Sequence, residues 1–319
     1  MGLTPALNRR AEKRRMSNKL KKQLQGKLVR DRAGIPEEAK DKLGSGNIKY
    51  VEGHFLEAEE LFMECIRLAP DFPDGYTSLS RLYEEMGDTM RSMNFLMAAA
   101  FFSKKDVQIW KDCARKSREN GAYRQAVYCY NNVIRREKDD PTWKRERGIT
   151  IVNLGPANYK KALKDLREFH ASFPEDSEVV ETIVKVEDES GNIQEAIEVM
   201  DDFIRNYKDQ VTLTHINMLA ELYMKHPENK PWHKIPELVS MAREEYLRGN
   251  PLPIDLESKE AVAYVNMDRK DLAREMAKRF LANEAYTVTD YEDVYSLFAD
   301  CFKQHEMYED ALPFAERLA

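Results

Sequence analysis

Apolar residues recur along this chain at helical spacing and predict pairs of α-helices. Tyr76, Leu79 and Tyr83 follow one another at i, i+3 and i+7, which places them on one face of a helix. Gly87 interrupts this pattern, and a second apolar face begins around Leu96. Because glycine readily ends a helix, the stretch predicts two helices joined by a short turn.

The same pattern repeats along most of the chain with a period of 34 residues. Gly53, Gly87, Gly121 and Gly155 are 34 residues apart, and Gly191 follows 36 residues later. Five positions after most of these glycines stand the small residues Ala58, Ser92, Ala126 and Ala196, and nine positions after them the large residues Phe62, Leu96, Tyr130 and Met200. This period is typical of the tetratricopeptide repeat. We therefore predict an all-α, right-handed superhelical solenoid.

The repeats predict an array over residues 39–319, with about eight helical pairs. The register slips by two residues near Pro156–Asn158, where an insertion in a turn costs little. A proline-rich segment, His226–Pro236, interrupts the sixth repeat, whose second helix we place at about Glu237–Leu247.

The last repeat stops at Ala319, inside its own second helix. Solenoids normally close with a polar terminal repeat. We therefore expect a front portion of a longer protein, with Leu312, Ala315 and Leu318 partly exposed or covered by a partner.

Composition agrees with a thin helical array that exposes much surface. Apolar residues make up 42% of the chain and charged residues 33%. No run of about 18 apolar residues predicts a membrane span, and the polar N-terminus has no apolar segment of a secretory signal. The four cysteines Cys65, Cys113, Cys129 and Cys301 are widely spaced, which indicates buried free thiols in a reducing compartment.

Positive charge is concentrated at the N-terminus, in residues 1–38. The first 32 residues hold eleven Lys or Arg against Glu12 and Asp31, so the net charge of −6 divides into +9 for this segment and −15 for the remainder. The cations are Arg9, Arg10, Lys13, Arg14, Arg15, Lys19, Lys21, Lys22, Lys27, Arg30 and Arg32. We predict a basic arm that is disordered or ordered by a partner. A solvated tail, a nuclear-import signal and a weak nucleic-acid contact all fit it.

The sequence contains no constellation of residues that predicts catalysis, a cofactor or a metal. The six histidines are scattered, and neither His226 nor His233 has ligands at metal-binding spacing. Phosphate-binding and nucleophile motifs are absent from the sequence. The chain is therefore expected to bind other molecules rather than to transform them.

The first helix of each tetratricopeptide repeat lines the concave groove of the array. In repeats two to four the positions that face this groove hold Arg81, Lys111, Arg115, Arg118 and Arg145. In repeat five they hold Glu178, Glu181, Lys185, Asp188 and Glu189. A groove that passes from positive to negative charge suits an extended peptide of matching charge order, although ordinary solvated faces also fit the pattern.

Several stretches resemble a particular family of repeat proteins. FLMAAAFFSKKDVQIWKDCA (95–114), QAVYCYNNVIR (125–135) and PIDLESKEAVAYVNMDRKDLA (253–273) are similar to the N-terminal repeats of the large tetratricopeptide subunit of transcription factor IIIC. The resemblance covers about residues 40–319 and not the basic segment.

The resemblance implies a nuclear assembly subunit without enzymatic activity. Its partners would be other subunits of transcription factor IIIC and, in RNA polymerase III initiation at genes such as those for transfer RNAs, the Brf and Bdp components of factor IIIB. A second repeat array beyond a linker would follow this one. A scaffold of another nuclear complex, such as one for RNA processing, and the targeting arm of a repeat-fused enzyme remain alternatives.

Overall fold

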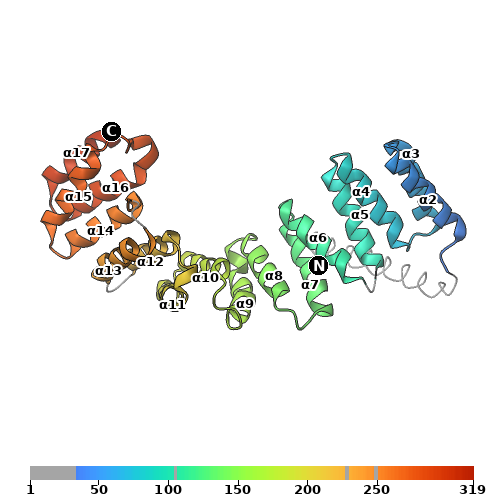
Figure 1. Ribbon diagram of the computed structural model, residues 1–319, viewed down its shortest axis with the longest axis horizontal. Helices are drawn as coiled ribbons and strands as arrows, with labels where there is room; N and C mark the ends of the chain where they lie inside the picture. Colours follow the sequence, from blue (N-terminus) through green and yellow to red (C-terminus); the bar gives the residue numbers. More distant parts are fainter. Residues whose placement is uncertain (1–33, 104–105, 227–229, 248–250) are drawn as a thin grey trace, which may run out of the picture. The chain divides into compact units, whose positions relative to one another are not determined.

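The computed structural model describes residues 34–103, 106–226, 230–247 and 251–319, which form sixteen α-helices and no strand (Figure 1). Contacts divide the chain into two compact units, one ending at Arg136 and the other spanning Glu137–Ala319. The first unit contains α2 (Glu37–Val51), α3 (Phe55–Leu68), α4 (Pro73–Glu85), α5 (Thr89–Phe102), α6 (Val107–Glu119) and α7 (Tyr123–Arg136).

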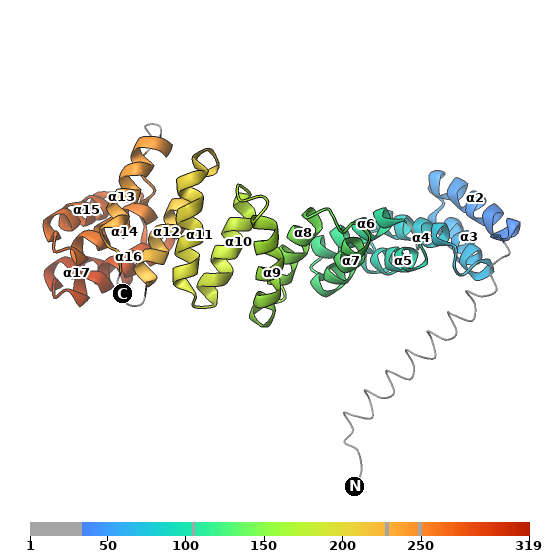
Figure 2. The ribbon, with the colours of Figure 1, turned by 90° about the horizontal axis from the view of Figure 1, so that it is seen from below.

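The second unit continues the same alternation of helices. Its α-helices are α8 (Thr142–Val152), α9 (Tyr159–His170), α10 (Ser177–Glu189), α11 (Ile193–Asn206), α12 (Leu213–Lys225), α13 (Lys234–Met241), α14 (Ile254–Asn266), α15 (Lys270–Ala282), α16 (Val288–Gln304) and α17 (Tyr308–Leu318). Within each unit consecutive helices pack as hairpins, such as α4 with α5 and α10 with α11 (Figure 2). These hairpins of about 34 residues are tetratricopeptide repeats, so the predicted all-α fold class is confirmed.

The repeating glycines end the first helix of their hairpins in the left-handed backbone conformation. Gly53, Gly87, Gly121, Gly155 and Gly191 have φ between 70° and 90°. A Cβ on Gly191 would meet no atom within 4 Å, so backbone conformation rather than space favours glycine there.

The last two hairpins make the same turn without glycine. Asp268 and Glu306, which follow α14 and α16, have φ of 60° and 58°. These two turns are not visible as part of the glycine series in the sequence, because neither residue is glycine.

The small residues of the repeat lie where helices cross closely. Ala58, Ala126 and Ala196 are fully buried, and Ser92 is nearly so. At Gly148, in the middle of α8, a Cβ would stand 2.8 Å from the side chain of Leu166 on α9. Such contacts let neighbouring helices approach and bury a continuous apolar stripe.

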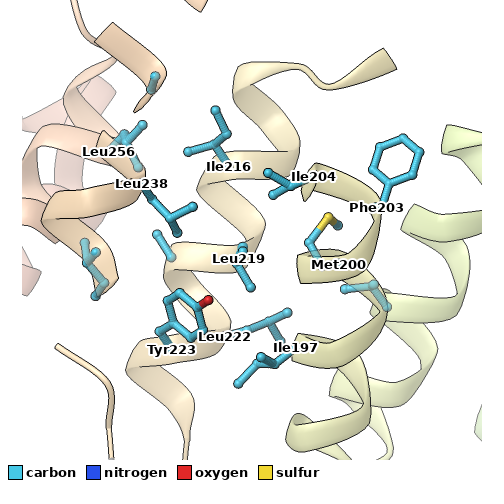
Figure 3. Close-up of a cluster of buried hydrophobic side chains, with 14 of the residues drawn as sticks. Ile197, Met200, Phe203, Ile204, Ile216, Leu219, Leu222, Tyr223, Leu238 and Leu256 are labelled. Atoms are coloured by element: carbon cyan, nitrogen blue, oxygen red, sulfur yellow. The ribbon is translucent and has the colours of Figure 1, made fainter. Parts of the chain in front are cut away.

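The largest part of this stripe in the second unit joins three successive hairpins. Figure 3 shows Met200 and Ile204 of α11 facing α12, where Leu219 points back toward them, and Leu238 of α13 on the other side of α12. All four cysteines are buried free thiols, as predicted, and Trp110 is buried as a packing residue.

Both interruptions of the repeat have a local structural explanation. After Gly155 a 3₁₀ turn, Pro156–Asn158, precedes α9 and accommodates the two-residue slip in the expected place. The predicted start of the sixth repeat's second helix at Glu237 was wrong, because α13 begins at Lys234. Pro236 lies in the first turn of α13, where its missing N–H has no helical partner to lose.

The end of that second helix lies within one residue of the expected Leu247, although its last turn is π-helical. After α13 the chain continues as a π-helical turn, Ala242–Tyr246, and the N–H of Leu247 donates to the carbonyl of Ala242. At the end of the second unit, Leu312 and Ala315 are exposed and Leu318 is half-buried, as the sequence analysis expected.

Candidate functional site

A groove of about 430 Å³ lies on the first helices of three successive hairpins in the second unit. Its lining comprises Ile149, Val152 and Asn153 of α8, Glu181, Thr182, Val184, Lys185 and Asp188 of α10, and Met218, Glu221 and Leu222 of α12. We call this surface the α8–α10–α12 groove. Its volume falls within the range of about 300–1,000 Å³ that is usual for ligand pockets in proteins.

Helical spacing directs these side chains to one side of the unit. Glu181, Lys185 and Asp188 are four and three residues apart, so they share one face of α10. The opposite face of α10, including Val180 and Ile183, is buried in the core. Helix α10 therefore combines a charged groove face with an apolar packing face.

The floor of the groove is unusually apolar at α8. Ile149 and Val152 occupy the two positions that hold Arg115 and Arg118 one repeat earlier and Lys185 and Asp188 one repeat later. Both residues are half-buried and line the groove. Neither residue was among the predicted groove residues, which are all charged, although Ile149 and Val152 occupy equivalent positions of their repeat.

One ammonium group links two carboxylates at the α12 side of the groove. Lys225 Nζ lies 2.8 Å from Asp188 Oδ2 and 2.7 Å from Glu221 Oε1. Burial opposes the charge of Lys225, but the hydrogen bonds from its ammonium to both carboxylates outweigh this and raise its pKa. The three side chains therefore form a fixed charged edge.

A fully buried histidine supports the carboxylate of Glu181. The Nδ1 atom of His215 accepts a hydrogen bond of 2.9 Å from the backbone N–H of Thr212, which places the imidazole proton on Nε2. His215 Nε2 is 2.7 Å from Glu181 Oε1 but has no hydrogen bond of good geometry. The imidazole therefore approaches the carboxylate of Glu181 closely without a well-formed hydrogen bond.

Arg145, one of the residues predicted to face a partner, is held by carboxylates of its own unit. Its Nε lies 2.8 Å from Asp176 Oδ2 and its Nη1 lies 2.8 Å from Glu146 Oε1, while its Nη2 pairs with Glu178. Burial opposes its charge, but these hydrogen bonds raise the pKa of Arg145. Arg145 and Glu178 do not line the α8–α10–α12 groove, and in the structure they connect α8 with α10.

The predicted cations of the first unit lie on α4 and α6. Arg81 and Arg115 are exposed, while Lys111 and Arg118 are half-buried. Lys111, Arg115 and Arg118 share one face of α6, and Arg115 Nη2 is 3.2 Å from Asp112 Oδ1. The expected change from positive to negative charge along one groove extends over both units and stays a prediction.

The basic arm lies outside the described residues, and so does every cation assigned to it. Within the described ranges no cluster of three or more His, Cys, Asp or Glu residues is arranged to hold a metal ion. None of the described helices is long and apolar enough to cross a membrane.

The hairpins define the chain as a tetratricopeptide-repeat protein whose second unit carries a groove on the first helices of three hairpins. No family model matches it. Its curated relatives, however, are subunits of transcription factor IIIC, which confirms the resemblance seen in the sequence. General transcription factor 3C polypeptide 3 of Homo sapiens is 27% identical over 219 residues, which cover 67% of this chain and 24% of that protein.

Two fungal relatives are also subunits of this transcription factor. Transcription factor tau 131 kDa subunit of Saccharomyces cerevisiae is 24% identical over 61% of this chain and 18% of its own length. Transcription factor tau subunit sfc4 of Schizosaccharomyces pombe is 23% identical over 42% of this chain and 14% of its own length. The chain thus matches at most about a quarter of each of these relatives.

Solved structures with similar helical arrangements come from varied proteins. A tetratricopeptide repeat protein from Parabacteroides merdae has a TM-score of 0.40 and 16% identity, covering 82% of this chain and 99% of that one. The structure of Naa15/Naa10 bound to HypK-THB has a TM-score of 0.49 and 12% identity, covering 83% of this chain and 39% of that one.

Proposed function

We propose that this chain is a non-enzymatic assembly subunit of transcription factor IIIC that acts in the nucleus and recruits factor IIIB for RNA polymerase III transcription. The observation that carries the proposal is the agreement of three curated relatives, all subunits of this factor. The repeat fold supports a scaffold role, because stacked hairpins present extended surfaces for partner binding.

The proposal assigns partner binding to charged first-helix faces in both units. Lys111, Arg115 and Arg118 offer cations to an acidic segment, and the α8–α10–α12 groove offers a second surface. The Brf and Bdp components of factor IIIB are the partners that the proposal names, alongside other subunits of transcription factor IIIC. The cations of the basic arm would contribute to nuclear import or to a weak DNA contact.

Co-purification of the tagged full-length protein from its own cells, read by mass spectrometry, tests the proposed function. We expect the other subunits of transcription factor IIIC together with Brf and Bdp, and occupancy of transfer-RNA genes in chromatin immunoprecipitation. Recovery of a different nuclear complex, without these subunits, would contradict the proposal.

A charge-reversal variant tests the surface on α6. Changing Lys111, Arg115 and Arg118 to Glu is expected to reduce recovery of factor IIIB at least tenfold, because like charges would then face an acidic partner. The matched control reverses Lys160, Lys161 and Lys164, three exposed lysines on the second helix α9. Equal recovery with both variants would overturn the assignment of this surface.

A further inference from the structure

The α8–α10–α12 groove combines an aliphatic floor with an excess of carboxylates. Ile149 and Val152 of α8 and Met218 and Leu222 of α12 contribute the aliphatic part of its lining. Among the described lining residues the carboxylates Glu181, Asp188 and Glu221 outnumber the ammonium of Lys185. Lys225, which lies outside the lining, pairs with Asp188 and Glu221 and not with Glu181.

Glu181 has the geometry of an incomplete ion pair. Its carboxylate is 42% exposed and contacts the imidazole of His215, a side chain that is 1% exposed. The Nδ1 atom of His215 accepts a hydrogen bond from the backbone N–H of Thr212, so Nε2 is the ring nitrogen that faces Glu181. His215 Nε2 lacks a hydrogen bond of good geometry, so this buried nitrogen has no hydrogen-bond partner among the described residues.

We propose that the α8–α10–α12 groove binds a short segment of a partner protein that carries an aliphatic side chain next to a Lys or Arg. The aliphatic side chain packs between Ile149, Val152 and Met218, and the cation pairs with Glu181. Packing of the apolar group excludes water from the groove, which strengthens the neighbouring ion pair. Charge complementarity selects this segment over an acidic one.

The inference rests on the proposed scaffold function but specifies a different surface and the opposite ligand charge from those tested on α6. An acidic segment suits the cations of Lys111, Arg115 and Arg118, whereas a basic and aliphatic segment suits this groove. The two surfaces therefore discriminate between partner segments by charge.

Selection of random 12-residue peptides displayed on phage against the 319-residue chain tests the inference without a known partner. We expect enrichment of peptides that hold Lys or Arg within a few residues of Leu, Ile, Val or Met. Synthetic peptides of the enriched sequences should bind with a dissociation constant that rises with salt concentration, because part of the affinity is an ion pair. Acidic peptides would be expected on the cations of α6, so the absence of basic, aliphatic peptides from the enriched set would overturn the inference.

Variants locate the binding within the groove. Val152→Asp and Glu181→Lys should each weaken peptide binding at least tenfold, and Glu181→Gln should weaken it less than Glu181→Lys. The matched controls are Leu272→Asp on α15 and Glu195→Lys on α11, both exposed residues outside the groove, and they should change affinity less than twofold. Circular dichroism and thermal unfolding identify any variant that fails to fold, and Glu181→Gln then carries the test, because it preserves shape.

Two further outcomes would count against the inference. Unchanged peptide binding in folded Val152→Asp and Glu181→Lys variants would place the peptide elsewhere. Self-association of the chain that these variants abolish in sedimentation experiments would identify a second copy as the occupant. Failure of co-purification with transcription factor IIIC would leave the peptide result intact, so the two proposals can fail separately.

Discussion

Arg147 of α8 holds Asp165 of α9 in a two-pronged ion pair. Arg147 Nε lies 2.7 Å from Asp165 Oδ2, and Arg147 Nη2 lies 2.6 Å from Asp165 Oδ1. The side chain of Asp165 is 5% exposed and that of Arg147 is 16% exposed. The pair joins the two helices of one hairpin, and Ile149 of the groove floor follows Arg147 by two residues on α8.

Removal of one partner of this pair is expected to destabilise the second unit strongly. Arg147→Met leaves the Asp165 carboxylate buried without its counter-charge, and we expect a loss of about 3 kcal/mol in the free energy of unfolding. The double variant Arg147→Met/Asp165→Leu should recover most of this loss, because no buried charge remains. Urea unfolding followed by circular dichroism measures both values, and a single variant as stable as the parent would show that the pair contributes little.

Replacing the residue with positive φ by glycine in a non-glycine turn is expected to stabilise the protein. Glu306 has φ of 58°, a left-handed conformation that costs a residue with a Cβ about 1 kcal/mol relative to glycine. Glu306→Gly is therefore expected to raise the free energy of unfolding by up to about 1 kcal/mol. In the reverse comparison, Gly191→Ala should lower it by about the same amount, since φ there is 80° and no neighbouring atom would clash. Thermal unfolding of both variants checks the sign, and a less stable Glu306→Gly protein would contradict the explanation.

Asp176 predicts an acid-dependent part of the stability. Burial opposes its ionisation, but hydrogen bonds from Arg145 and from the backbone of Val179 outweigh this and hold its pKa below the ordinary value of 3.8. A carboxyl whose pKa is lower in the folded state stabilises the fold above its unfolded pKa, and this contribution is lost as pH falls toward the folded value.

The corresponding experiment compares Asp176→Asn with the parent protein by urea unfolding between pH 7 and pH 3. We expect the variant to be less stable at pH 7, and the difference to shrink below about pH 4 as Asp176 of the parent becomes protonated. Glu175→Gln, which changes the neighbouring exposed carboxylate, is the control. If the difference in free energy of unfolding between the variant and the parent stays constant across this pH range, ionisation of Asp176 does not contribute to stability.

The buried thiols predict low reactivity in the folded protein. Burial raises the pKa of Cys301 to about 11, so little of the nucleophilic thiolate is present near neutral pH. Iodoacetamide should label Cys301 at least tenfold more slowly in the native protein than in urea, where the thiol regains its ordinary pKa. Mass spectrometry of tryptic peptides measures the rate, and equal labelling in both states would show that Cys301 is accessible.

The sequence predicted the helical hairpins because its pattern is local and repeated. Residues such as Ala58 and Gly87 recur at fixed distances, and each position has one physical role, either a close helix crossing or a left-handed turn. The ends of helices were harder to predict where a residue type, such as proline, occurs both in loops and in the first turn of a helix. Pro236 indicated a break, yet the first turn of α13 accepts it.

The sequence by itself determined the repeat, the burial of the cysteines and the helix faces on which Glu181 and Lys185 lie. The tertiary structure alone decided which of those charges remain available, because ion pairs form between residues far apart in the chain. It paired Arg145 with Asp176 and Glu178, and it placed Glu181 against His215. It also combined Ile149 and Val152 with side chains of two later repeats into one groove, since the packing of successive first helices is a property of the folded chain.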